Sequence, residues 1–127
     1  MLGKGILWIS ALLFTGYGMV SFFAPGIPTD FAGLAIMNGD GRAEIGAMYG
    51  GLQTGIGLFC LLAALNTNYF RAGLILLVLG IGALALGRLY SAVVTTDPLT
   101  AYTYGALIYE ITTAALAALA LMNLQRE

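Results

Sequence analysis

Four long apolar segments constrain the fold of this sequence more than any other feature. They cover about residues 5–24, 43–65, 72–94 and 101–123, and each is close to the roughly 20 residues that a helix needs to cross a bilayer core. A soluble chain of 127 residues could not bury them, because 60% of its residues are hydrophobic and only 9% are charged. The sequence therefore predicts an all-α integral membrane protein, a four-transmembrane-helix bundle forming a single domain over residues 1–127.

The basic residues between the segments predict the orientation of this bundle. Lys and Arg in short loops favour the cytoplasmic side of a membrane. Lys4, Arg71 and Arg126 all fall on one side of the predicted bundle, whereas Arg42 falls on the other. We therefore expect an N-in/C-in topology, with both termini in the cytoplasm. The short connection at residues 66–71 further predicts that the second and third helices are antiparallel neighbours.

The longest connection, residues 25–42, opens with two prolines and closes with the turn sequence NGDG. Between these breakers it carries the apolar residues Phe31, Leu34, Ile36 and Met37. We expect a short segment that lies on the outer membrane interface or caps the bundle, and a partner-binding loop is the alternative. Asp40 is expected to cap the second helix.

The composition excludes several classes of function. Histidine is absent and Cys60 is the only cysteine, which removes most transition-metal sites, disulfides and dithiol chemistry. Cys60 itself lies in an apolar run, where a thiol packs as a small hydrophobic group. The net charge of −1 does not favour nucleic-acid binding, which needs a basic face. We predict no catalytic residue, no metal site and no cofactor.

Glycines within the predicted helices recur at spacings that favour helix packing. In lipid, small residues let helix backbones approach one another closely. Gly73, Gly80 and Gly87 recur every seven residues and so form one stripe on the third helix. On the second helix, Gly51 and Gly55 share the face of Glu44. We predict that these five glycines are helix-packing positions.

Three charged residues fall within the spans: Glu44, Arg88 and Glu110. A charge near the centre of a bilayer costs about 2.5 to 3.5 kcal/mol on insertion scales unless it is paired or hydrated. Arg88 lies about 24 Å along a core about 30 Å thick, and Glu110 lies about 13 Å below the outer edge. Glu44 begins its helix at that edge. All three therefore fall in the outer half of the membrane.

Helical phase indicates that this charge cluster faces the bundle interior. Glu110 shares its helix face with small residues, whereas the opposite face carries large apolar ones. The small residues are Thr103, Ala106, Thr113, Ala114 and Ala117. The large apolar residues are Ile108, Ile111, Leu119 and Met122. We predict a network of Glu44, Arg88 and Glu110, with Tyr49, Gln53 and Tyr109 as hydrogen-bonding neighbours. Three roles remain open: pinning helices together, binding a small polar molecule, ion or lipid headgroup, and proton relay or catalysis.

The sequence also resembles a known family. The run EIGAMYGGLQTGIGLF at residues 44–59, the run ALGRL at residues 85–89 and then Glu110 are similar to the domain of unknown function 4345 family, over essentially the whole chain. The resemblance implies a small bacterial four-helix protein of the cytoplasmic (inner) membrane, with motif positions at Glu44, Tyr49, Gly50, Gly51, Arg88 and Glu110. Family members often carry an arginine where this sequence has Gly46, so its network has one charge fewer.

Two functions are consistent with these observations. The first is a structural or accessory subunit that packs against itself, as a homo-oligomer, or against other subunits of a larger membrane complex. The second is a binder or carrier of a small solute or lipid that uses an outer-half polar cavity around Arg88. The lipid bilayer is the one partner that both readings require.

Overall fold

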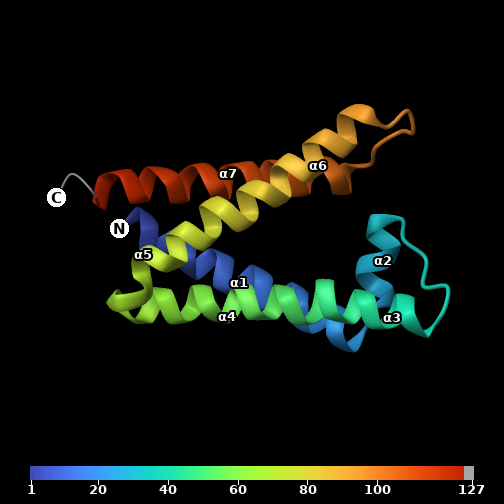
Figure 1. Cartoon of the computed structure of the whole chain (residues 1–127), viewed down its shortest axis with the longest axis horizontal. Coiled ribbons are helices and arrows are strands. Elements are labelled where there is room, and N and C mark those ends of the chain that lie inside the picture. The colour runs from blue at the N-terminus through green and yellow to red at the C-terminus, as the bar shows by residue number, and fades with distance from the viewer. Residues whose placement is uncertain (125–127) are drawn as a thin grey trace. The chain divides into compact units, whose positions relative to one another are not determined.

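The computed structural model describes residues 1–124 of the chain, and almost all of them are helical (Figure 1). Within this part, four helical stretches are long and apolar enough to cross a membrane: Leu2–Phe23, Gly39–Leu65, Thr67–Val94 and Ala101–Leu124. The four predicted apolar segments lie within these stretches, apart from residue 24. The all-α class and the four spans are therefore confirmed. Arg126, which entered the orientation argument, lies outside the described residues.

The four stretches are divided into shorter elements. The order is α1 (Leu2–Phe23), α2 (Gly26–Ala32), α3 (Gly39–Ile45), η1 (Gly46–Gly51), α4 (Leu52–Leu65), α5 (Thr67–Leu76), η2 (Leu77–Ile81), α6 (Gly82–Val94) and α7 (Ala101–Leu124). The elements η1 and η2 are π-helical turns that interrupt the second and third spans without breaking them. Such turns are rare and insert one extra residue into a helical register.

Asparagine side chains begin the second and third spans. The Asn38 carboxamide oxygen accepts a hydrogen bond of 2.9 Å from the Gly41 amide and so caps α3. Asp40, the predicted cap, instead lies within the first turn of α3, because Asn38 already occupies the capping position. Asn66 caps α5 in the same way, through the Asn68 amide. The predicted 66–71 connection is consequently shorter than expected, since helix resumes at Thr67.

The chain divides into two compact units, and the unit Trp8–Leu62 is held together by a close approach of α1 and α4. A Cβ atom added to Gly57 would lie within 3.0 Å of the Thr15 backbone, and one added to Gly18 would meet Thr54 in the same way. The two glycines therefore face threonines across one crossing. This contact is the small-residue packing expected between helices in lipid.

The second unit contains Met1–Leu7 and the chain from Ala63 onward. Gly73 packs against Ala63 and Leu7, and a Cβ atom at Gly3 would meet Phe70 and Ala120. The start of α1, the start of α5 and the end of α7 therefore lie at one end of this unit, as Figure 1 shows. Fully buried Leu74, Leu77, Ile81, Thr113 and Ala117 form its core.

The buried face of α7 agrees with the phase predicted from the sequence. Glu110, Thr113, Ala117 and Ala120 are buried, whereas Ile108, Ile111, Leu119 and Met122 are exposed. Small side chains thus face the protein and large apolar ones face outward. This distribution is inverted relative to a soluble helix, because lipid is a favourable environment for large apolar side chains.

Candidate functional site

The candidate site is an ion pair between two neighbouring spans of one unit. Arg88 lies on α6 and Glu110 on α7. The connection between these helices is short, and the Thr95 hydroxyl oxygen accepts a hydrogen bond of 3.2 Å from the Asp97 amide within it. Arg88 lies about 9 Å before the end of α6, and Glu110 lies about 14 Å after the start of α7. The long Arg88 side chain bridges the difference in depth between these two positions.

The guanidinium group engages both oxygens of the carboxylate. Arg88 Nε donates to Glu110 Oε1 at 3.0 Å and to Oε2 at 2.9 Å, and Nη2 donates to Oε1 at 2.7 Å. The Glu110 side chain is only 5% exposed, whereas that of Arg88 is 24% exposed. The carboxylate is therefore the buried member of the pair. Bonds between two ionised groups are shorter and stronger than neutral ones.

An aromatic ring completes the surroundings of the guanidinium. The Arg88 Cζ atom lies 5.9 Å from the centre of the Tyr102 ring, a distance at which a cation–π attraction operates. Tyr102 was not among the predicted site residues. The available signal was its position on α7, about two turns before Glu110, which places it near the level of the Arg88 side chain.

The π-helical turn η2 determines which face of the third span carries Arg88. In an uninterrupted α-helix, Gly73, Gly80 and Gly87 would share one face. The buried positions are instead Gly73, Leu74, Leu77, Ile81 and Ala85. The partly buried Arg88 follows Ala85 by three residues and so lies on the same helix face. The extra residue at η2 rotates the later part of the helix, so the predicted single stripe is interrupted.

This rotation leaves Gly80 and Gly87 exposed, and Gly51 and Gly55 of the second span are exposed as well. Gly73 is the one member of the predicted packing set whose added Cβ would collide with a neighbouring helix. A packing role for the other four glycines stays a prediction.

Three of the other predicted site residues belong to the unit Trp8–Leu62, and the fourth lies on α7. Glu44 is exposed on α3, in the unit Trp8–Leu62. Tyr49 on η1 and Gln53 on α4 are half-buried in that same unit, and Tyr109 is half-buried on α7 beside Glu110. The structure thus brings Arg88 and Glu110 together, while the participation of Glu44, Tyr49, Gln53 and Tyr109 stays a prediction. No group of three or more His, Cys, Asp or Glu residues placed to hold a metal ion occurs within residues 1–124.

Four helices in residues 1–124 are long and apolar enough to span a bilayer, and a partly buried ion pair joins two of them. These features define an all-α integral membrane protein. Within this class, the chain belongs to the family described as Domain of unknown function (DUF4345), whose model matches residues 2–121. The resemblance indicated by the motifs around Glu44, Arg88 and Glu110 is therefore confirmed. No curated protein and no solved structure matches the chain.

Proposed function

We propose that this protein is a structural or accessory subunit that packs, through its second span, against a second copy of itself or against a larger membrane complex. The observation that carries this proposal is a series of small residues on the outside of that span. Ala47, Gly51 and Gly55 are spaced by four and are all exposed. Ala47 and Gly51 lie within η1, so the exposure of all three residues, and not the spacing alone, indicates that they face outward.

An exposed glycine does not stabilise a helix whose surface contacts only lipid. Glycine destabilises a helix interior by roughly 1 kcal/mol relative to alanine, and it has no side chain to pack. A small-residue series of this spacing does, however, let a second helix approach closely. Gly80, Ala83 and Gly87 on the third span are likewise exposed. These residues support a role in helix association beyond the single chain.

The alternative function is a binder or carrier of a small solute or lipid at Arg88. It is favoured by the partial exposure of the Arg88 side chain, which is 24% exposed while it binds Glu110. An anionic group that reached the exposed part of the guanidinium would find a charged donor beside an aromatic ring. Such a ligand would have to compete with Glu110, whose carboxylate already takes three hydrogen bonds.

The location and orientation are part of the same proposal. We place the protein in the bacterial cytoplasmic (inner) membrane, as a single four-helix domain with both termini on the cytoplasmic side. Exposed Lys4 and Arg71 support this orientation, because Gly3 packs against Phe70 and so brings these two cations to one end of the unit. Basic residues at one end favour the cytoplasm.

The test is native mass spectrometry of the protein extracted with its surrounding lipid. We expect the parent chain to carry a second copy or another protein subunit. Replacement Gly55→Leu should remove that partner, because an added side chain at Gly55 meets open space within the chain itself but would block an approaching helix. Gly16→Leu is the matched control on α1, where an added Cβ also meets nothing, and it should retain the partner.

Each contrary result has a definite meaning. A parent chain that carries no protein partner, with an unchanged Gly55→Leu variant, would exclude the subunit function. If the parent chain instead carries a small molecule or lipid, and Arg88→Gln loses that ligand, the result would favour the binder function over the subunit function.

A further inference from the structure

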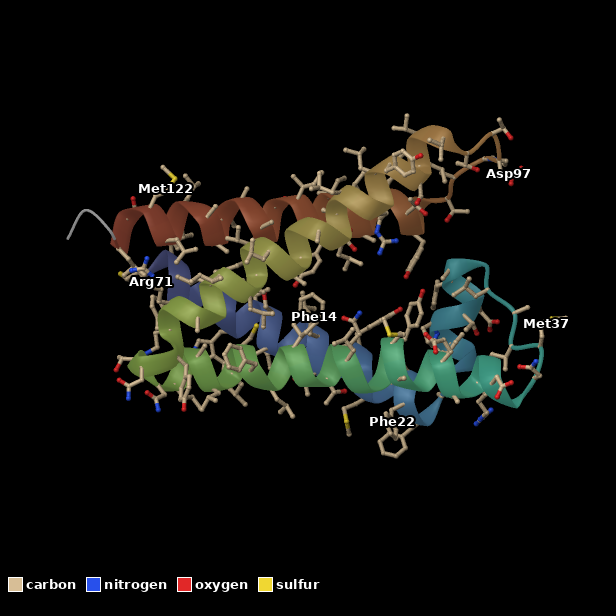
Figure 2. All side chains as sticks on the ribbon, viewed as in Figure 1. Phe14, Phe22, Met37, Arg71, Asp97 and Met122 are labelled. Atoms are coloured by element: carbon tan, nitrogen blue, oxygen red, sulfur yellow. The ribbon has the colours of Figure 1, made fainter. Side chains whose placement is uncertain are left out.

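The segment that joins the first two spans presents an apolar surface of its own. It contains the short helix α2 and the residues up to Met37. Its exposed apolar side chains are Ile27, Phe31, Leu34 and Met37, with Phe31 at 68% and Met37 at 84% exposure. Figure 2 shows Met37 at the outer edge of the loop. Large apolar side chains exposed within one short segment indicate that part of it interacts with something other than water.

The helix α2 has three distinct sides. Successive residues are rotated by about 100° around a helix axis. Pro28 and Thr29 are buried against the unit Trp8–Leu62. Ile27 and Phe31 share a second side, and exposed Asp30 lies on a third. One side therefore faces protein, one is apolar and one is polar.

Local hydrogen bonds hold these sides in place. The Thr29 hydroxyl donates to the carbonyl oxygens of Pro25, at 3.0 Å, and Gly26, at 2.9 Å. The helix ends at Gly33, whose φ of 68° is in the left-handed region, and the Leu34 amide bonds back to the Thr29 carbonyl at 2.9 Å. Gly33 has no Cβ, so it adopts this conformation without strain. The orientation of α2 is thus built into the unit.

The position of α2 identifies the environment that its apolar side meets. The first span ends at Phe23, and two residues separate it from α2, so the helix begins within about 11 Å of the end of the span. Phe22 and Phe23, at the end of that span, are also exposed apolar residues. In Figure 1, α2 lies across the direction of α4. Because α4 crosses the membrane, a helix across it lies roughly along the membrane surface.

We infer that α2 is an interfacial element that inserts Ile27 and Phe31 among phospholipid acyl chains. The leaflet concerned is the one opposite the leaflet nearest to the termini. Amphipathic helices of this kind bury their apolar side about 5 to 10 Å into the boundary between headgroups and acyl chains. Asp30 faces the aqueous side. The partner is the lipid surface itself, and the element determines how deeply this end of the protein sits in the bilayer.

Tryptophan fluorescence in reconstituted vesicles tests this inference. The background variant is Trp8→Phe, which removes the single native tryptophan. Phe31→Trp, Ile27→Trp and Asp30→Trp are then each made in that background, and circular dichroism checks that each remains helical. The vesicles are phosphatidylcholine with a fraction of lipid brominated near the start of the acyl chains. Iodide serves as the aqueous quencher.

We expect tryptophan at positions 27 and 31 to emit at shorter wavelength, to be quenched by the brominated lipid and to be protected from iodide. The matched control Asp30→Trp, on the same helix, should show the reverse pattern. Strong iodide quenching at positions 27 and 31 would place them in water and overturn the inference. Protection from both quenchers would mean that a protein surface covers them, which would overturn it as well. Equal lipid quenching at positions 30 and 31 would refute the three-sided orientation.

Discussion

Replacing Arg88 by leucine removes the side chain that donates three hydrogen bonds to the Glu110 carboxylate within residues 1–124. The carboxylate would then be left at 5% exposure without its three hydrogen bonds. Breaking a buried ion pair by removal of one member costs about 3 to 5 kcal/mol, because the remaining charge is uncompensated. We therefore expect the free energy of unfolding to fall by about this amount in Arg88→Leu.

Replacing the other member should have a smaller effect. In Glu110→Gln the guanidinium keeps a neutral acceptor nearby, and its side chain is already 24% exposed. A long basic side chain near the end of a span can also turn toward the aqueous boundary. We expect a loss of about 1 to 3 kcal/mol. The two single variants should thus differ by about 2 kcal/mol, or roughly 30-fold in the equilibrium constant of unfolding.

Equilibrium unfolding in mixed micelles, with increasing sodium dodecyl sulfate, measures this difference through circular dichroism and the fluorescence of Trp8. The double variant Arg88→Leu/Glu110→Leu should recover most of the loss, because neither charge remains. Arg42→Leu, which replaces an exposed arginine of α3, is the control and should unfold like the parent. Equal stability of Arg88→Leu and the parent, or a double variant as unstable as Arg88→Leu, would refute the reasoning.

Two further predictions concern the packing of the unit Trp8–Leu62. Gly57→Ala should lower the free energy of unfolding by about 1 to 3 kcal/mol, because the new methyl group would collide with the Thr15 backbone. The control Gly55→Ala adds a methyl group in open space and should be neutral or stabilising. Equal effects of the two replacements in the same unfolding assay would contradict the close α1/α4 crossing. Cys60 is fully buried, so N-ethylmaleimide should label it far more slowly in native micelles than in dodecyl sulfate. Thr96→Cys in a Cys60→Ala background places a thiol in an exposed loop as the reference. Equal labelling rates of Cys60 and of this introduced thiol in native micelles would show that Cys60 is accessible.

The four spans were predictable from the sequence because the features that define them are local. A run of about 20 apolar residues must become helical in lipid, where every backbone polar group needs an internal partner. The phase of α7 was also readable, since that helix continues without interruption from Ala101 to Leu124. Its small face and Glu110 therefore turned inward together. Pairing of Arg88 with Glu110 followed from the outer-half depth of both residues, from the inward phase of Glu110 and from the cost of an unpaired charge.

The predictions were wrong where a helix departs from a constant register. The stripe of Gly73, Gly80 and Gly87 assumed one period along the whole third span, and η2 rotates the later part by one residue. Nothing in the local run LVLGI shows that this turn is π-helical, because its residues are ordinary helix formers in lipid. The sequence did not identify α1 as the helix that packs against Gly57, since the close approach at Gly18 and Gly57 depends on the threonines opposite them.

The sequence by itself determined that this chain enters a membrane as four helices and that its few intramembrane charges must be compensated. Both conclusions follow from the free energy of moving apolar and charged groups between water and lipid, which depends on residue type. The tertiary structure decided which faces meet, which glycines allow close contact and that Arg88 binds both oxygens of Glu110. Those choices depend on the shapes of surfaces brought together from distant parts of the chain, and residue type alone does not encode them.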